Sequence, residues 1–456
     1  MVTKQQMRKR AKQATILLDR WFDYQVKSNQ VPGMAVGIVH DGDVIYRGAF
    51  GLADIRAKKP TTTQTCYHIA SISKTFTATA IMQLVEHKQL RLADKVSKHL
   101  PWLLKAADQN LTTITIRQLL THTAGVSRDG DLPQWVDDNF PTADHVKEFF
   151  LKQEATFFKP GKQFKYSNYG YGLLGLVIEA VSGANYEDYL KQHIFKPLGL
   201  RHTSVEAQSN TKKLIARGYG KQRPGEQREV MGDIVTRGLA PAAGLVSNVD
   251  DLCRYLTAQL MGSKQLLTDQ SKRAMQRIQH NRGKHEKLHY GLGYDIWQDG
   301  THRQFGHGGG FSGQTTNIRM EPATKLGVVL LSNSIDGLPW QLAGGVYATL
   351  HHFIEQGGTL RNGKKLTGAG RYTGRFRWRG SDVEVVAIAG RLIAFFPDSR
   401  TPALNLVRLT PTGRNEFRIE GGSNFDCIGE TVRYVFDRRG QVKTFFWGPE
   451  PLDKLS

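Results

Sequence analysis

Cysteine is scarce in this sequence: Cys66, Cys253 and Cys427 are the only three among 456 residues. Such an odd and sparse set gives no disulfide framework and is typical of a reducing compartment. Long hydrophobic runs are also missing, because no stretch approaches the roughly 18 consecutive apolar residues of a membrane-spanning helix. We therefore expect no membrane partner and a cytoplasmic location.

A secretion signal is not evident at the start of the chain either. The first residues are basic, but Asp19 and Arg20 interrupt the apolar positions between Ile16 and Phe22. This pattern indicates an amphipathic helix, whereas a signal peptide needs an uninterrupted apolar segment.

Acidic residues are few relative to basic ones. The chain has 62 Lys and Arg against 41 Asp and Glu, a formal net charge of +21, which could serve nucleic-acid binding. The basic residues are scattered, however, and their densest cluster, Lys4 to Lys12, has no RNA-binding, zinc-finger or helix-turn-helix pattern beside it. We interpret the charge as a solvated basic surface and expect no nucleic-acid partner.

The hydrophobic pattern predicts an α/β fold. Met34 to Val39 and Val44 to Phe50 read as a β-hairpin, residues 71–200 are mostly helical, and short strands follow between residues 293 and 333 before a helix over 338–355. Because the hairpin and the later strands bracket the helical segment, we expect one antiparallel sheet flanked by helices, with a helical lobe.

The C-terminal part differs in character. Residues 357–370 form a polar, glycine-rich linker, and short strands at close, regular spacing follow it, which predicts an all-β domain, a lipocalin-like barrel or a sandwich. The expected division is a domain of residues 1–356, a linker of residues 357–370 and a small antiparallel β domain of residues 371–456.

The stretch from His68 to Leu84 offers a candidate nucleophile. Its apolar residues recur at helical spacing, which places Ser71 and Lys74 one turn apart. On a helix this hydroxyl and this amine point the same way, and the positive potential of a helix N-terminus eases loss of the amine's proton. A capping serine beside a solvated lysine is the alternative, and the tetrapeptide alone is weak evidence.

Further polar motifs follow in the chain. Tyr166 and Asn168 lie in a loop that leads into a predicted helix, and His307 precedes three glycines beside a predicted strand, where a backbone with few side chains lets a substrate approach closely. The segment Leu119 to Gly125 (LLTHTAG) completes the pattern. Taken singly, these motifs are also compatible with a packed aromatic turn and a structural histidine.

Ser-x-x-Lys, Tyr-x-Asn and His-x-Gly in this order resemble the motifs of the serine β-lactamase and penicillin-binding-protein family. The likeness covers about residues 31–355 and is greatest to the class C-like branch, which includes D-stereospecific aminopeptidases, DD-carboxypeptidases and esterases. It implies that Ser71 attacks a carbonyl carbon while Lys74 and Tyr166 share the transfer of its proton. The substrate-binding positions that it implies are Asn168, His307, Gly309 and Gly310, with the backbone amides of Ser71 and Gly310 holding the oxyanion.

From this resemblance we expect a serine hydrolase that cleaves amide or ester bonds of small peptides or acyl compounds through an acyl-enzyme, with no cofactor. The alternative is a penicillin-binding or sensor-type protein that is acylated without turnover. His307 stands where most relatives that recognise carboxylate-bearing β-lactams carry Lys or Arg, which disfavours β-lactamase or cell-wall peptidase activity. For Tyr166 to act as the base, its pKa must fall well below its usual value of about 10. A homo-oligomer is left open.

Two other motifs are judged fortuitous. His285 to His289 matches the zinc-protease string H-E-x-x-H, but a glycine precedes it, a predicted strand follows at once and no third ligand is apparent. Gly358 to Lys365 nearly matches a phosphate-binding loop but has Lys365 where Ser or Thr must hold magnesium. We therefore expect no metal. The sequence also has no G-x-S-x-G, which argues against an α/β-hydrolase nucleophile.

Overall fold

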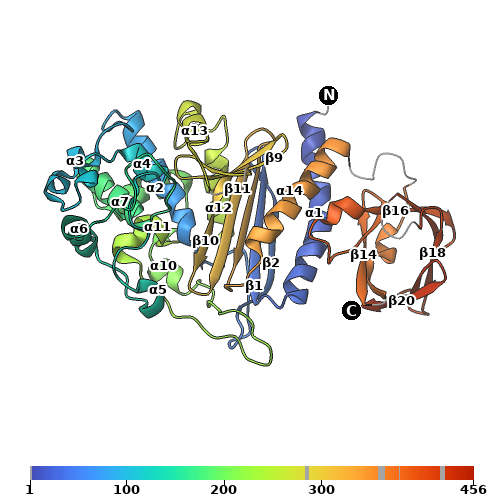
Figure 1. Ribbon diagram of the computed structural model, residues 1–456. Coiled ribbons are helices and arrows are strands. Elements are labelled where there is room, and N and C mark those ends of the chain that lie inside the picture. The colour runs from blue at the N-terminus through green and yellow to red at the C-terminus, as the bar shows by residue number, and fades with distance from the viewer. Residues whose placement is uncertain (1–2, 283–286, 358–364, 379, 422–426, 456) are drawn as a thin grey trace. The chain divides into compact units, whose positions relative to one another are not determined.

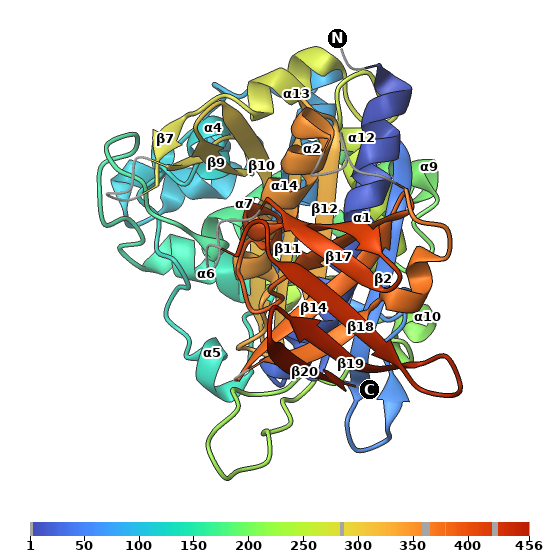
Figure 2. The same ribbon diagram turned by 90° about the vertical axis from the view of Figure 1, so that its right-hand side faces the viewer.

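The computed structural model describes residues 3–282, 287–357, 365–378, 380–421 and 427–455. The chain forms two compact units, one of residues 31–339 and one of residues 1–30 together with 340–456 (Figures 1 and 2). The division expected from the sequence, at residues 357–370, stays a prediction.

The 31–339 unit is built on an antiparallel sheet, confirming the predicted fold class. In the described part of the chain it has nine strands in the order β3-β2-β1-β12-β11-β10-β9-β8-β7. Their bounds are β1 Gly33–His40, β2 Asp43–Asp54, β3 Lys59–Pro60, β7 His280–Asn281, β8 Leu288–Tyr290, β9 Asp295–Asp299, β10 His302–Phe311, β11 Gln314–Glu321 and β12 Leu326–Ser332. The predicted hairpin is β1–β2, closed by Asp41 and Gly42 in the left-handed region with φ of 52° and 90°.

Helix α12 (Val249–Gln259) lies directly on the centre of the sheet. Glycine makes this close approach feasible, because a Cβ on Gly37 of β1 would collide with Cys253 of α12, and one on Gly327 of β12 would collide with Val39 and approach Leu256. Cys253 is therefore a small packing residue.

A helical lobe lies beside β10, as the sequence pattern predicts (Figure 1). Its central helix is α2 (Ser73–Glu86), whose Phe76 stacks on Tyr255 of α12 with ring centroids 3.9 Å apart. The other helices of this unit are α3 Val96–His99, α4 Ile116–Leu120, α5 Gln134–Asp137, α6 Ala143–Lys152, α7 Asn168–Ser182, α8 Tyr186–Leu190, α9 Lys196–Leu198, α10 Ser209–Lys212, α11 Ala240–Ala243 and α13 Asp269–Met275.

A small three-stranded sheet connects distant parts of the lobe. It has the order β4-β6-β5, with β4 Tyr67–His68, β6 Leu245–Ser247 and β5 Ser204–Val205. The backbone N–H of Ile69, just after β4, donates to Leu245 O at 2.9 Å. The chain that enters α2 is thus fixed against the chain that leaves α11.

The other unit contains helices α1 (Lys4–Ser28) and α14 (Pro339–Gln356, whose first residue belongs to the 31–339 unit) and a closed antiparallel barrel of the strands β13 to β20, so the predicted all-β domain is a barrel. The barrel strands are β13 Gly374–Trp378, β14 Ser381–Ile388, β15 Arg391–Phe395, β16 Val407–Gly413, β17 Glu416–Glu420, β18 Thr431–Phe436, β19 Val442–Trp447 and β20 Glu450–Leu455. Strand β20 contains Pro451, a residue that is uncommon inside strands because it cannot donate a ladder hydrogen bond, and this proline is paired with Phe446 of β19. Glu384 on β14 is fully buried and binds Arg20 of α1 and Arg375 of β13.

None of the helices in the described residues is long and apolar enough to cross a bilayer.

Candidate active site

Ser71 lies in a tight turn between β4 and α2. The sequence predicts it on the helix itself, but residues Ala70–Ile72 form a single 3-10 turn and α2 begins at Ser73. Ala70 has φ of 47°, in the sparsely populated left-handed region, so the residue before the serine holds an unfavourable conformation. This bend lets the serine hydroxyl and Lys74 face one another.

Lys74 is fully buried and its amine has three neighbours. Nζ lies 2.7 Å from Asn168 Oδ1, 2.8 Å from Ala242 O and 3.3 Å from Ser71 Oγ. Burial holds the pKa of Lys74 well below its usual value of 10.5, and the carboxylate of Asp129 opposes this effect in part. The main cause of the lowered lysine pKa is therefore desolvation, and not the potential of the helix N-terminus that the sequence pattern suggests.

The orientation of Asn168 determines where the lysine's lone pair points. Asn168 Nδ2 donates to Asp129 Oδ1 at 2.6 Å, and because a carboxylate only accepts, the amide oxygen must face Lys74. The amine then donates one proton to this oxygen and the other to Ala242 O, which also only accepts. The remaining lone pair of a neutral amine points at Ser71 Oγ and can accept its proton.

Tyr166 approaches Ser71 from another direction. Its hydroxyl donates to Ser71 Oγ at 2.8 Å, and Lys74 Nζ lies 4.7 Å from the ring centroid. Burial raises the pKa of the Tyr166 phenol. This shift is opposite in direction to the lowered pKa that a tyrosine base requires, and the hydrogen bond to Ser71 favours the phenol as a proton donor.

One loop, residues 122–129, holds the Tyr166 segment from both sides. His122 accepts from Lys165 N through its carbonyl oxygen at 2.7 Å and from Ser167 N through Nδ1 at 3.0 Å. Burial lowers the pKa of His122 well below 6.5, so Nδ1 stays available as an acceptor. The roles of His122 and Asp129 do not follow from the sequence pattern, although His122 is the histidine of the LLTHTAG segment.

His307 lies within β10, whereas the sequence pattern predicts it beside a strand. Its ring is 2% exposed; Nδ1 donates to Gly308 O at 2.6 Å and Nε2 accepts from Tyr290 OH at 3.3 Å. Burial lowers the pKa of His307 to about 4. His307 is therefore neutral at pH 7, and both ring nitrogens are engaged within the protein.

Gly309 and Gly310 of β10 differ in their surroundings. A Cβ on Gly309 would collide with Ile69 O and Thr316 Oγ1, so this glycine lets β10 pack against the turn that carries Ser71. Gly310 is exposed, and a Cβ there would meet no atom within 4 Å. The open space in front of the strand is thus at Gly310.

Ala242, whose carbonyl oxygen accepts from Lys74, belongs to the segment 236–244, which packs against α2. The carbonyl of the neighbouring Pro241 accepts from Thr77 Oγ1 at 2.7 Å. Glu206 holds the start of this segment, accepting from Thr236 N at 2.9 Å, and burial raises the pKa of Glu206 to about 7. The sequence offers no signal for Ala242, because it acts through its backbone.

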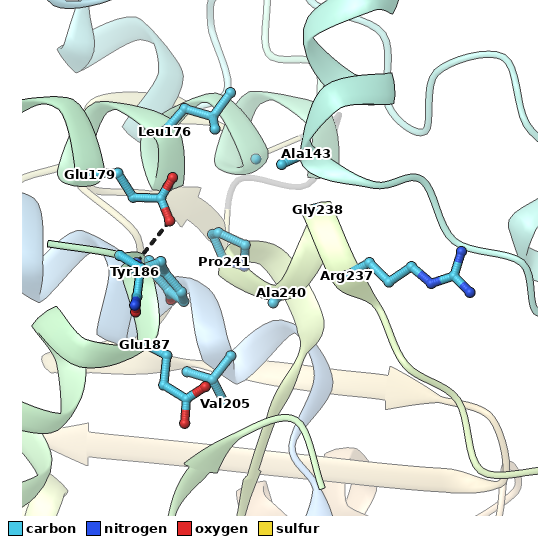
Figure 3. Close-up of a pocket in the computed structure, with 13 residues that line it drawn as sticks. Ala143, Leu176, Glu179, Tyr186, Glu187, Val205, Arg237, Gly238, Ala240 and Pro241 are labelled. Carbon is cyan, nitrogen blue, oxygen red and sulfur yellow. Dashed lines mark hydrogen bonds between the residues drawn. The ribbon is translucent and has the colours of Figure 1, made fainter.

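The outer side of the same segment borders a pocket of about 220 Å³. Figure 3 shows Gly238, Ala240 and Pro241 on one wall of this pocket, facing Glu179 and Tyr186 from the helical lobe. Ser71 and Lys74 do not line it, so this pocket is separate from the catalytic group.

The two motifs judged fortuitous fall largely outside the described residues. This applies to His285 and Glu286 of the zinc-type string and to residues 358–364 of the phosphate-type string. The remaining histidine, His289, lies on strand β8 with its Nδ1 2.8 Å from Asn281 Oδ1. The expectation of no metal stays a prediction.

Comparison with known proteins finds one matching family model and several relatives of similar sequence. A family model described as Beta-lactamase matches residues 18–340. Protein flp of Staphylococcus aureus (strain N315) is 30% identical over 319 residues, 69% of this chain and 62% of that protein. A protein named Beta-lactamase from Escherichia coli (strain K12) is 30% identical over 235 residues, 52% of this chain and 58% of that protein. The chain thus spans less than two thirds of the length of these curated relatives.

Among solved structures, the octameric penicillin-binding protein homologue from Pyrococcus abyssi is similar over 96% of this chain and 99% of its own, with 25% identity and a TM-score of 0.66. This similarity extends over nearly the whole chain, whereas the family model ends at residue 340. Since that model still covers well over half of the sequence, the protein belongs to the β-lactamase family.

Proposed function

We propose that this protein is a serine hydrolase that cleaves amide or ester bonds of small peptides or acyl compounds through an acyl-enzyme on Ser71. The observation that carries the proposal is the meeting of two proton-transfer groups at one hydroxyl: Ser71 Oγ lies 3.3 Å from Lys74 Nζ and 2.8 Å from Tyr166 OH. The β-lactamase family assignment supports a hydrolase.

The first step forms the acyl-enzyme. The neutral amine of Lys74 accepts the proton of Ser71 Oγ as this oxygen bonds to the substrate carbonyl carbon. The carbonyl oxygen takes up the negative charge, and the backbone N–H groups of Ser71 and Gly310 stabilise it. The exposure of Gly310 leaves room for the substrate at this position.

The second step expels the leaving group and then hydrolyses the ester. As the bond between the carbonyl carbon and the leaving nitrogen or oxygen breaks, the Tyr166 hydroxyl gives that atom its proton, and the Lys74 ammonium restores the proton to Tyr166. A water molecule then attacks the acyl carbon with Lys74 again as base, and the proton returns to Ser71 Oγ. Throughout both steps, Asn168 Oδ1 accepts a hydrogen bond from Lys74, and the hydrogen bond from Asn168 Nδ2 to Asp129 keeps the amide in this orientation.

Covalent labelling tests the assignment of the nucleophile. A fluorophosphonate probe should add one adduct to the full-length chain by intact mass, and Ser71→Ala should show none while keeping the wild-type circular dichroism spectrum. An undiminished adduct on Ser71→Ala would refute the assignment.

Turnover separates a hydrolase from a protein that is acylated and stalls. A panel of p-nitrophenyl esters, D-amino-acid amides and a chromogenic β-lactam should show repeated product release from at least one substrate class. A stable adduct without release would favour the penicillin-binding or sensor alternative.

A chelator tests the expected absence of a metal. The rate should stay unchanged, and a loss of activity that added zinc restores would support a zinc site at the H-E-K-L-H string.

We also propose that copies of the chain associate. The octameric state stated for the Pyrococcus abyssi homologue supports this expectation. Light scattering coupled to gel filtration measures the assembly directly, and a monomer mass at micromolar concentration would contradict it.

A further inference from the structure

An aromatic cluster lies at the end of β10, immediately after Gly310. The ring of Phe311 stacks on His68 with centroids 5.2 Å apart and lies 6.3 Å from Phe140 and 6.4 Å from Trp135. Trp135 and Phe140 meet edge to face, with centroids 5.0 Å apart and an interplanar angle of 84°. The tryptophan ring is thus held by two other aromatic rings in a favourable geometry.

Exposure is uneven within this cluster. Phe140 and Phe311 are buried, but Trp135 on α5 is 42% exposed, so part of a large apolar ring faces solvent at a fixed place. His68 is neutral at pH 7, because burial lowers the pKa of its ring to about 4 against the opposing effect of the Asp233 carboxylate. The solvent-facing part of Trp135 is itself apolar and aromatic, and the Arg237 side chain lies beside the cluster, donating to Phe140 O at 3.3 Å.

Strand β10 relates this cluster to the catalytic group. His307 lies 6.2 Å from the Tyr166 ring, Gly310 follows three residues later, and Phe311 is next. Four residues of extended strand span about 13 Å. β10 therefore runs from the Tyr166 side of the site, past the amide of Gly310, to the aromatic cluster.

The direction of the strand indicates where each half of a substrate lies. The proposed mechanism places the leaving group beside its proton donor, Tyr166, and the carbonyl oxygen at Gly310. The acyl substituent then extends the other way along β10, toward Phe311 and the exposed ring of Trp135.

We propose that Trp135, supported by Phe140 and Phe311, forms the subsite for the acyl group, and that the preferred substrates carry an aromatic or other bulky apolar acyl group. This inference rests on the proposed function and adds its substrate class. Trp135 is the specificity-determining residue, because the other two rings are already covered by protein.

A pair of esters with the same leaving group tests the preference. The ratio of kcat/KM for p-nitrophenyl phenylacetate to that for p-nitrophenyl acetate should fall about tenfold in Trp135→Ala, by loss of an aromatic contact. Trp135→Phe should retain most of the ratio. Val136→Ala is the matched control, because this neighbour on α5 is 87% exposed and should leave the ratio unchanged.

A second readout does not depend on turnover. Phenylmethanesulfonyl fluoride and methanesulfonyl fluoride both sulfonylate a reactive serine, and the ratio of their labelling rates on Ser71 should fall in Trp135→Ala in the same proportion. Intrinsic reactivity cancels when the ratio is compared between variants.

The outcomes separate the two proposals. If neither ester is hydrolysed while Ser71 is still labelled, the panel of amides and the β-lactam decides the proposed turnover, and the sulfonyl fluoride ratio decides the subsite. Both ratios unchanged in a folded Trp135→Ala variant would overturn the subsite. Unchanged ratios with a smaller assembly would show instead that Trp135 belongs to a contact between copies.

Discussion

Replacing Asp129 by asparagine tests the electrostatics of the catalytic lysine. Asp129 accepts from Asn168 Nδ2 at 2.6 Å, and Asn168 in turn holds Lys74 Nζ at 2.7 Å, so the carboxylate lies about 7 Å from the amine by this path. A negative charge at this distance stabilises the ammonium form of Lys74. Asp129 is accordingly the principal charge that raises the lysine's pKa against the effect of burial.

The size of the effect follows from Coulomb's law. At about 7 Å and an effective dielectric constant of about 20, one unit charge contributes roughly 2 kcal/mol. This energy corresponds to a displacement of about 1 to 2 pH units in the titration of Lys74. Arg128 pairs with Asp129 at 3.1 Å and would lose this partner in the variant. Its positive charge also lowers the pKa of Lys74, so it acts in the same direction as the loss of the Asp129 carboxylate.

The sign is fixed by the mechanism. Acylation needs the neutral amine, so the acidic limb of kcat/KM rises as Lys74 loses its proton. Asp129→Asn lowers the pKa of Lys74, and the limb should move to lower pH by about 1 to 2 units. The maximal rate should fall as well, because the new amide no longer fixes the orientation of Asn168.

The measurement is kcat/KM against pH on an uncharged ester for the wild type and two variants. Asp131→Asn is the matched control, because this nearby carboxylate pairs with His145 and does not touch Asn168. A limb that stays in place or moves to higher pH in Asp129→Asn would refute the reasoning, and so would an equal shift in Asp131→Asn.

Two further substitutions test the stability of the fold. Gly309→Ala should destabilise the protein by about 1 to 3 kcal/mol and slow acylation, because the added Cβ collides with Ile69 O in the turn that carries Ser71. Gly310→Ala is the control and should leave the melting temperature unchanged, so equal melting temperatures for the two variants would refute this prediction. Glu384→Ala should lower the free energy of unfolding of its unit by about 2 to 4 kcal/mol, measured by denaturant titration. Both Arg20 and Arg375 lose a buried carboxylate partner, and the loss at Arg20 is the smaller because this arginine is partly exposed to solvent. Exposed Glu416→Ala is its control, and similar curves for both variants would contradict the prediction.

The sequence predicted best what is encoded locally. Helical periodicity placed residues 71–200 in a mostly helical segment, and helices α2 to α9 lie there. The spacing of Ser71 and Lys74 likewise indicated that the two groups face each other, which they do at 3.3 Å.

What the sequence could not supply depends on tertiary contacts. Asp129 lies 39 residues from Asn168, and nothing in its local pattern announces their hydrogen bond. Ala242 acts through a carbonyl oxygen that every residue possesses. The strand character of β10 was missed around His307, because a run of glycines has low β propensity and forms a strand here through pairing with β11.

The closure of the barrel bears on how that part of the chain can open. β20 pairs with β13 through residues 375–377, so the first and last strands are neighbours and each of the eight strands is hydrogen-bonded on both sides. A flat sheet frays from its outermost strand, but a ring has no outermost strand, so no strand can leave the barrel unless both of its seams part. The barrel should therefore exchange most of its amide hydrogens as one cooperative block, and the short seam between β15 and β16, with three residue pairs, is where we expect the ring to break first.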